Sequence, residues 1–278
     1  MPRVRIGIIL LLWLGPALLP APPENHVSRK ARAHRLETPP VPDGLVNEPV
    51  WQQITPLTDF VQQEPDEGQP ATERTEVRIG YDDRFLYLGI ICHDSEPLHI
   101  VSTQARRDAP LEDTDSILIL LDTFNDDQNA FVFGTTPSGM EYDGQVSKAG
   151  QGRGDLRTPS QRSSTGGGSG DGGGSRRSPS QRGGASAFNL NWDGVWWVQS
   201  WITGRGWEAE MVIPLKTLRY NPGSGRTWGL NVTRNLRRRN EQSFWAPVSR
   251  AFTFNQVELA GGLEGRDLKV QRTLKVIP

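Results

Sequence analysis

The chain has 278 residues, 35% of them hydrophobic and 23% charged, so it can bury the core of one large β domain or two small ones. Its formal net charge of −1 provides no overall positive field, which argues against a nucleic-acid-binding protein. The 30 glycines and 21 prolines predict many turns and favour an all-β fold.

The N-terminus has the composition of a secretory signal peptide. A basic start, MPRVR, precedes the apolar run IGIILLLWLGPALL and the proline-rich exit PAPPEN. We expect a signal peptide over residues 1–21 and export to the periplasm, the outer membrane or the extracellular space; a short membrane anchor is the alternative. Residues 22–40 are polar and proline-rich and are predicted to be a linker. Cys92 is the only cysteine, so no internal disulfide can form.

The first predicted strands follow a linker-like start. Residues 75–93 predict a β-hairpin: Val77, Ile79 and Tyr81 alternate with polar residues, Asp82-Asp83 turn the chain, and Phe85 to Cys92 form the returning strand. The run SILILLD, residues 116–122, has apolar residues on both faces of a strand, so it predicts a central strand that is covered on both sides. Residues 129–136 predict a further strand. Residues 149–187 are glycine, serine and arginine with little to bury and predict a disordered insertion.

After the insertion, the stretch NWDGVWWVQSW at 191–201 holds four of the nine tryptophans. Further strands are predicted at 206–214, 227–236 and 242–248. If 194–202 and 207–213 pair through a four-residue loop, Ile202 lies opposite Trp207, and one face carries Trp196 and Trp207 into the core. A shift of one residue would mix charged and apolar side chains on both faces.

The other face of that hairpin is the candidate binding surface. Indole rings beside amide and carboxylate groups are suited to a sugar, whose C–H face stacks on the ring while its hydroxyls need polar partners. The alternative is that a second sheet or a loop covers this face and that its carboxylates pair with arginines. The candidate residues are Trp197 and Trp201 for stacking and Gln199, Glu208 and Glu210 for hydrogen bonding.

Five segments, in order, resemble family 9 carbohydrate-binding modules. They are VPDGLVNEPVW (41–51), TEVRIGYDDRFLYLGIICHD (75–94), DTDSILILLDT (113–123), GWEAEMVIPLKTL (206–218) and TWGLNVTRN (227–235). The resemblance implies a two-sheet antiparallel β-sandwich of the jelly-roll or immunoglobulin-like kind over residues 41–265. It also implies carbohydrate binding and association with glycoside hydrolases and carbohydrate catabolism.

The string RRRNEQSFWAPVSR (237–250) is similar to a bacterial subgroup in which such a module precedes a C-terminal region predicted to be a β-barrel. Residues 266–278 would then begin the connection to that region. This favours a second hypothesis, a periplasmic docking or plug module for an outer-membrane barrel, without a sugar ligand. Arg234 and the arginines at 237–239 could serve such docking.

The family's tryptophan clamp does not carry over to this chain. Leu111 and Glu112 occupy the loop where the first clamp ring is expected, and Phe252 and Phe254 are the rings available at the second position. Any sugar site therefore needs a different arrangement. Secondary candidates in the same loop are Arg106, Arg107 and Asp108.

The sequence also contains candidate residues for three other chemistries. Oxygen-rich loop ends suit a structural calcium ion, with candidate ligands Asp113, Asp115, Asp122, Asn125 and Asp127. Glu208 and Glu210 could form the carboxylate pair of a glycosidase, although nothing around them indicates a cleft. A haem-binding sandwich would need axial ligands, for which the candidates are Met140, Met211, His93 and His99.

Overall fold

The structure is a computed structural model that describes residues 29–103, 106–111, 113–147, 187–220 and 227–265. The expected signal peptide, the first part of the expected linker, and residues 266–278 lie outside the described residues. So does the predicted insertion, except for Ala187, which begins a strand. These expectations therefore stay predictions.

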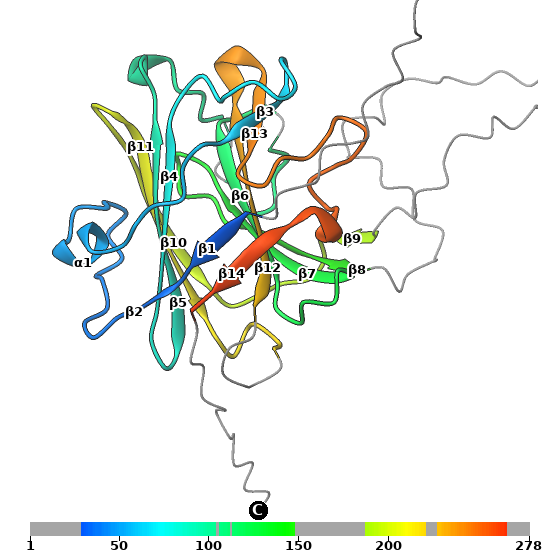
Figure 1. Ribbon diagram of the computed structural model, residues 1–278. Coiled ribbons are helices and arrows are strands. Elements are labelled where there is room, and N and C mark those ends of the chain that lie inside the picture. The colour runs from blue at the N-terminus through cyan, green and yellow to red at the C-terminus, as the bar shows by residue number, and fades with distance from the viewer. Residues whose placement is uncertain (1–28, 104–105, 112, 148–186, 221–226, 266–278) are drawn as a thin grey trace, which may run out of the picture.

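The described residues form two β-sheets packed face to face, which confirms the predicted β-sandwich (Figure 1). The nine-stranded sheet contains β1 (Lys30–Arg32), β14 (Gly261–Glu264), β12 (Trp228–Leu236), β6 (Ser116–Asp122), β7 (Asn129–Thr135), β8 (Tyr142–Ser147) and β9 (Ala187–Asn189), with β13 (Glu241–Phe244) and β3 (Val61–Glu64) joined beside β12. The five-stranded sheet contains, in spatial order, β10 (Trp197–Thr203), β11 (Gly206–Pro214), β5 (Phe85–His93), β4 (Thr75–Tyr81) and β2 (His34–Arg35).

Helix is scarce in the described chain. The α-helix α1 spans Pro49–Gln52, and short 3₁₀ turns lie at Pro97–His99, Arg237–Arg239 and Val257–Leu259. Within these described segments, no helix combines the length and the hydropathy that a membrane crossing requires.

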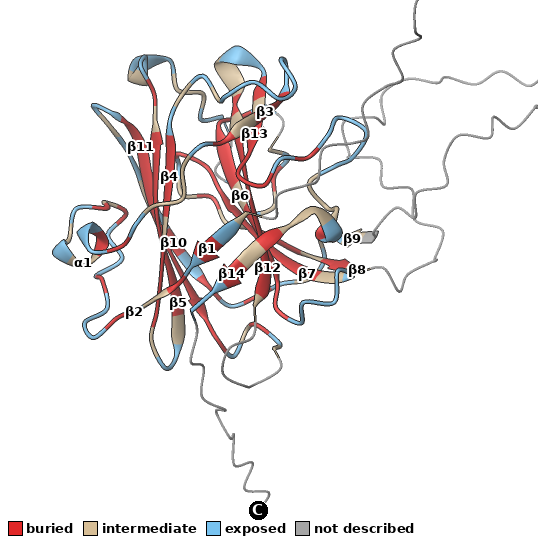
Figure 2. Ribbon diagram, in the orientation of Figure 1, coloured by how far each residue is buried: buried red, intermediate tan, exposed pale blue. Residues whose placement is uncertain are grey.

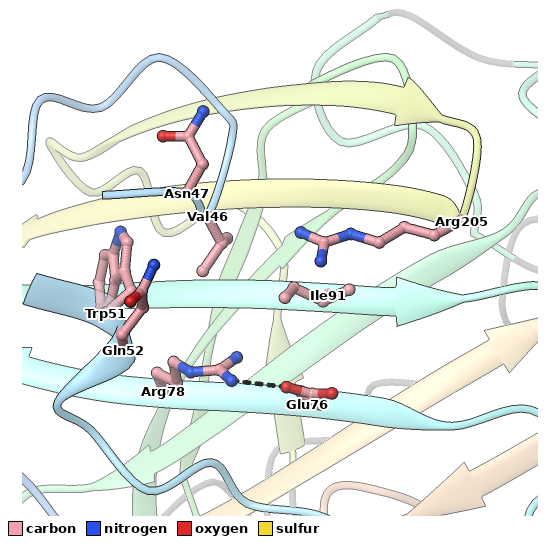
Figure 3. Close-up of a pocket in the computed structure, with 8 residues that line it drawn as sticks. All are labelled: Val46, Asn47, Trp51, Gln52, Glu76, Arg78, Ile91 and Arg205. Atoms are coloured by element: carbon pink, nitrogen blue, oxygen red, sulfur yellow. Dashed lines mark hydrogen bonds and ion pairs between the residues drawn. The ribbon is translucent and has the colours of Figure 1, made fainter. Parts of the chain in front are cut away.

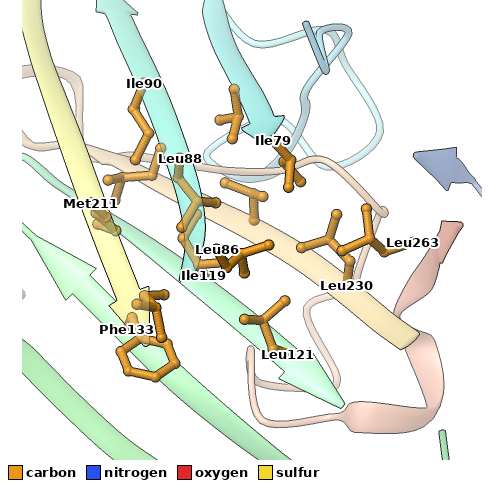
Figure 4. Packing of buried hydrophobic residues seen from close by; sticks show 14 of the residues in the cluster. Ile79, Leu86, Leu88, Ile90, Ile119, Leu121, Phe133, Met211, Leu230 and Leu263 are labelled. Carbon is orange, nitrogen blue, oxygen red and sulfur yellow. The ribbon is translucent and has the colours of Figure 1, made fainter. Parts of the chain in front are cut away.

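The core lies between the two sheets and is built by alternation along the strands. Figure 4 shows side chains from both sheets meeting there, including Ile79 and Leu88 from the five-stranded sheet and Ile119 and Leu230 from the other. Every second residue of a strand points to the same face, so β11 contributes Trp207, Ala209, Met211 and Ile213 to this core. Figure 2 shows the same buried band along the facing strands.

Strand β6 is buried on both faces, as its sequence predicts. It lies between β12 and β7, and Ile117, Ile119 and Leu121 point into the main core. Leu120 points to the opposite face, where it joins a second cluster with Val132 and other apolar residues. The predicted hairpin at 75–93 is also confirmed, because β4 and β5 pair antiparallel around Asp82-Asp83.

The prediction of a linker over residues 22–40 is wrong for residues 30–32 and 34–35, which form strands. β1 pairs parallel with β14, and β2 pairs parallel with β4, so the chain enters both sheets before Val41. The two parallel pairs also differ from the expected fully antiparallel sandwich. Strands β1 and β2 form because Ala31 and Ala33 alternate with charged residues. Both alanines are small enough to be buried at the edge of the sandwich.

Residues 36–54, called here the outer segment, cover much of the five-stranded sheet on the face away from the core (Figure 1). Trp51 lies directly over Gly89 of β5, where an added Cβ would come within 2.9 Å of the indole. The outer segment and the sheet thereby bury a separate apolar cluster: Leu36, Val46, Trp51, Ile54, Tyr87, Ile91 and Val212.

Two glutamates of β11 hold the outer segment in place. The carboxylate of Glu210 accepts hydrogen bonds from the backbone N–H groups of Asp43 and Gly44, at 2.8 and 2.9 Å, and from the Trp51 indole at 2.8 Å. The carboxylate of Glu208 accepts a hydrogen bond from the Val46 backbone at 3.0 Å and pairs with Arg205. Because both side chains are buried, these donors are needed to offset lost hydration.

Burial, together with the nearby carboxylate of Glu48, raises the pKa of Glu210. Oxygen atoms of Asp43, Glu48 and Glu210 lie within 4.8 Å of one another. Burial raises the pKa of Glu210 to about 7, with a further contribution from the charge of Glu48, against hydrogen bonds that lower it. One oxygen of Glu48 is buried without a hydrogen-bond partner among the described residues. Glu210 therefore changes charge near neutral pH rather than near its ordinary pKa of 4.5.

This arrangement predicts that Glu210 makes the folded state less stable as pH rises. Between pH 4.5 and 7 the folded protein retains a proton that the unfolded chain loses, so the contribution of this group declines over that range, by up to about 3 kcal/mol. Urea unfolding of the wild type and of Glu210→Gln, from pH 5 to pH 8, should show their stability difference shifting in favour of the variant as pH rises. Glu48→Gln should make the decline shallower. A difference that stays constant with pH would contradict the raised pKa.

Candidate functional site

The register of β10 and β11 places side chains on the outer face as the sequence predicts. Ser200 pairs with Ala209, Val198 with Met211 and Ile202 with Trp207. Following the same pairing across β5 and β4 gives three rows of outer-face residues: Trp201, Glu208, Ile91, Glu76; then Gln199, Glu210, Gly89, Arg78; then Trp197, Val212, Tyr87, Gly80.

The four tryptophans of the hairpin divide as predicted. Trp196 and Trp207 are 2% and 1% exposed and lie in the main core. Trp197 and Trp201, on the outer face, are 50% and 56% exposed. The Trp197 ring contacts Phe85, with centroids 6.3 Å apart, and the Trp201 indole donates a hydrogen bond to the Asp43 carbonyl at 2.7 Å. Both rings are thus held by neighbours while about half of each side chain faces solvent.

The outer segment passes between these two indoles. Gly44 has φ of +91°, and a Cβ there would lie 2.9 Å from Gln199 C, Ser200 N and Trp201 Cδ1. Glycine is therefore required both for the backbone conformation and for the close contact with β10. Asp43 and Gly44 rest on the strand between the rings, so Trp197 and Trp201 flank the outer segment instead of forming one uninterrupted surface.

The three polar candidates of this face differ in their exposure to solvent. Gln199 is exposed on the edge strand β10. Glu208 and Glu210, expected to contact a ligand, lie under the outer segment with exposures of 3% and 1%, and protein groups occupy their oxygens. The candidate surface is open only along the edge strand β10. Over β11 the alternative holds, because the outer segment covers that strand and Glu208 pairs with Arg205.

A pocket that the sequence analysis missed lies beside α1 on the outer face (Figure 3). Its volume is about 420 Å³. The outer segment, both strands of the β4–β5 hairpin and the β10–β11 turn contribute its lining: Val46, Asn47, Trp51, Gln52, Glu76, Arg78, Ile91 and Arg205. The charged pair Glu76 and Arg78, two residues apart on the predicted hairpin, is a sequence feature that could have indicated this pocket.

Glu76 is the most heavily paired group of this pocket. Its carboxylate contacts Arg78 at 2.6 Å, His93 at 3.0 Å and Arg74 at 3.1 Å. Burial acts to raise the pKa of Glu76, but hydrogen bonds from His93 and Arg78 outweigh it and leave the pKa below its ordinary value. Glu76 is therefore a carboxylate held ionised by its neighbours.

Arg107, a secondary candidate, ties separate segments together. Its guanidinium contacts Glu141, Asp143 and Asp193, each at 2.6 Å. Asp143 is fully buried and also accepts a hydrogen bond from the Gly194 backbone, and burial raises its pKa. Asp108 accepts a hydrogen bond from the Asp143 backbone, whereas Arg106 is exposed. The contacts of Arg107 and Asp108 are those of a structural ion-pair network.

The five candidate calcium ligands do not form one site. Asp113 and Asp115 precede β6, while Asp122, Asn125 and Asp127 lie at its other end, roughly 20 Å away along the strand. Asp115 accepts hydrogen bonds from the backbones of Val101 and Arg237. Asp122 accepts them from the backbones of Phe124, Asn125 and Asp127. Backbone donors already occupy these carboxylates, so this set does not fit a single shared ion.

The four haem-ligand candidates occupy unrelated environments. Met211 is buried in the main core and Met140 is also buried. His93 contacts Glu76 through Nε2, and the exposed His99 contacts Glu96. Nothing in their placement pairs one of the methionines with one of the histidines.

The Arg107 network predicts a stability effect at that position and none at its neighbour. Arg107→Gln should lower the free energy of unfolding by about 1 to 3 kcal/mol, because it leaves the buried Asp143 without its cation, while the partial exposure of Arg107 moderates the loss. Arg106→Gln should change it by less than about 0.5 kcal/mol. Chemical unfolding of both variants measures this; equal effects would contradict the structural role.

Comparison with known proteins places the fold. No protein-family model matches the sequence, and no curated protein matches it. A family 9 carbohydrate-binding module from Caldicellulosiruptor kristjanssonii, solved in complex with cellotriose, is similar at a TM-score of 0.52 and 14% identity, over 90% of this chain and 98% of that one. A presumed carbohydrate-binding protein from Bacteroides uniformis is similar at a TM-score of 0.57 and 13% identity, over 86% of this chain and all of that one. The chain therefore has a sandwich fold like that of a family 9 carbohydrate-binding module.

Proposed function

We propose that this protein is a non-catalytic carbohydrate-binding module whose ligand stacks on Trp197 and Trp201. The observation that carries the proposal is the pair of half-exposed indoles on one face of the edge strand β10. The fold supports it, since the similar module from Caldicellulosiruptor kristjanssonii was solved with cellotriose bound.

Stacking on these rings is favourable for physical reasons. The C–H face of a sugar ring is apolar and fits a flat indole, and Gln199 between the two rings supplies an amide for hydroxyl groups. Trp201 is held by its hydrogen bond to Asp43 and Trp197 by Phe85, so little side-chain freedom is lost on binding.

The spacing of the rings favours a chain of sugars over a single one. Four residues along a strand separate the Cα atoms of Trp197 and Trp201 by about 13 Å. One sugar ring cannot contact both indoles across that distance and across the outer segment between them. The proposed ligand is thus an oligosaccharide or polysaccharide that contacts each ring with a different unit.

The wider biological setting remains a set of predictions from the sequence. Export, a role in polysaccharide degradation or uptake, a structural calcium ion and a C-terminal barrel partner belong to this set. No feature of the described residues favours the docking or plug hypothesis over carbohydrate binding.

Glycan titration tests the proposal. Isothermal titration with a panel of soluble oligosaccharides should find at least one ligand, and Trp197→Ala and Trp201→Ala should each weaken its binding by roughly three- to tenfold. Trp201→Phe separates stacking from anchoring, because phenylalanine keeps a ring and loses the hydrogen bond to Asp43. Phe124→Ala, which removes a partly exposed ring elsewhere, is the matched control and should bind normally. If the folded protein binds no glycan of the panel, the proposal fails.

A further inference from the structure

The pocket beside α1 offers groups that the tryptophan pair does not use. Its base is apolar, formed by Val46, Trp51 and Ile91, which belong to the cluster under the outer segment. Around this base stand two carboxamides, Asn47 and Gln52 (Figure 3). Both residues are exposed, and their side chains have no hydrogen-bond partner among the described residues. A small apolar base with unused amides at its rim suits one sugar ring.

The carboxylates beside this pocket are already engaged by protein groups. Arg78 and Arg74 pair with Glu76, and Arg205 pairs with Glu208. The remaining contacts of the two glutamates come from His93 and from the Val46 backbone. What the pocket can offer a ligand therefore depends on the arginine donors that these pairs leave unused.

Each arginine that lines the pocket also keeps a nitrogen without an acceptor. Arg205 uses Nε and Nη2 for Glu208, and its Nη1 has no partner among the described residues. Arg78 uses Nη2 for Glu76, and its Nη1 is buried without an acceptor. Figure 3 shows the two guanidinium groups on either side of Ile91. A donor without an acceptor is costly, so a ligand oxygen that pairs with Arg205 Nη1 gains from it, and Arg78 Nη1 gains in the same way once its side chain turns toward the ligand.

The pocket and Trp201 lie on the same side of the sheet. Trp201, Glu208 and Ile91 occupy one cross-strand row, which puts the Cα atoms of Trp201 and Ile91 about 10 Å apart, and the outer segment covers Glu208 between them at Val46. A glycan that stacks on Trp201 and passes over Val46 can therefore place a further sugar unit in the pocket. Trp197 lies two rows away on the other side of the outer segment.

We propose that this pocket recognises a sugar unit bearing a carboxylate, so that the preferred ligand is a uronic-acid-containing glycan. This rests on the proposed carbohydrate-binding function. The carboxylate of the sugar accepts hydrogen bonds from Arg205 and Arg78, its ring lies on Val46 and Ile91, and its hydroxyls meet Asn47 and Gln52. A guanidinium fork matches the planar carboxylate of the sugar in geometry and attracts its negative charge.

The direct test compares acidic glycans with their methyl esters, which keep the sugar ring and lose the charge. Trimers of galacturonate, glucuronate and mannuronate are titrated into the full chain at pH 7 and low salt, beside each methyl ester and the neutral galactose, glucose and mannose trimers. We expect at least one free acid to bind roughly tenfold or more tightly than its ester, and this preference to shrink as salt is added.

Variants locate the preference. Arg205→Gln and Arg78→Gln should each remove most of the difference between acid and ester, and Arg205→Lys, which keeps the charge and the pairing with Glu208, should retain part of it. The matched control is Arg35→Gln, an arginine of the same sheet that pairs with Asp83 outside the pocket. It should leave the preference intact. Unfolding curves identify a variant that has lost its fold. If a glutamine variant is unfolded, the acid–ester preference of Arg205→Lys decides whether Arg205 contacts the carboxylate.

The outcomes separate the two proposals. Equal binding of acid, ester and neutral trimers, weakened by Trp201→Ala, would keep the proposed function and overturn the uronate inference. A preference for the acid that survives both Arg205→Gln and Arg78→Gln would overturn this pocket as its source. No binding of any trimer would count against both.

Discussion

The attachment of the outer segment depends on two buried carboxylates of β11 that point away from the main core. Glu208 and Glu210 alternate with the core residues of β11 and so point away from the core, yet they are almost fully buried. A buried carboxylate needs donors, and the outer segment supplies them through the backbones of Asp43, Gly44 and Val46 and the indole of Trp51. Because β11 keeps these two acids, residues 36–54 are bound to the sheet instead of extending away as a linker.

This attachment decides which parts of the outer face remain open. β10 is an edge strand beyond the reach of most of the outer segment, so Trp197 and Trp201 stay half exposed. On the other side of Trp51 the segment leaves the pocket whose unused arginine donors we assign to a uronate. Both proposed contacts with a glycan thus exist because the covering is partial. The same attachment also makes this surface sensitive to pH, since Glu210 titrates near neutrality.

The arrangement differs from a clamp that closes on one sugar from two sides. In this chain the two indoles stand on one strand with backbone between them, and the groups that could orient hydroxyls come from the outer segment and the β4–β5 hairpin. A site of this form binds several sugar units of a glycan, each through a different contact. Specificity for charge and affinity from stacking can then be altered independently, through the arginines or through the tryptophans.

The local sequence was sufficient for the sandwich and for much of its pairing. Alternation of apolar and polar residues in 75–81 and 197–213 dictates which side chains enter the core, because a slip of one residue would bury charges. The hairpin register and the burial of Trp196 and Trp207 followed from it, and the continuous apolar run at 116–122 indicated a central strand. The edge strands β1 and β2 could not be predicted in this way, since three and two residues carry too short a pattern and their partners lie far along the chain. What only the tertiary structure decided was the fate of the outer face. Alternation tells that Trp201 and Glu208 share a face, but whether that face meets solvent depends on where residues 36–54 fold back, and so do the burial of Glu210 and the pocket between Arg78 and Arg205.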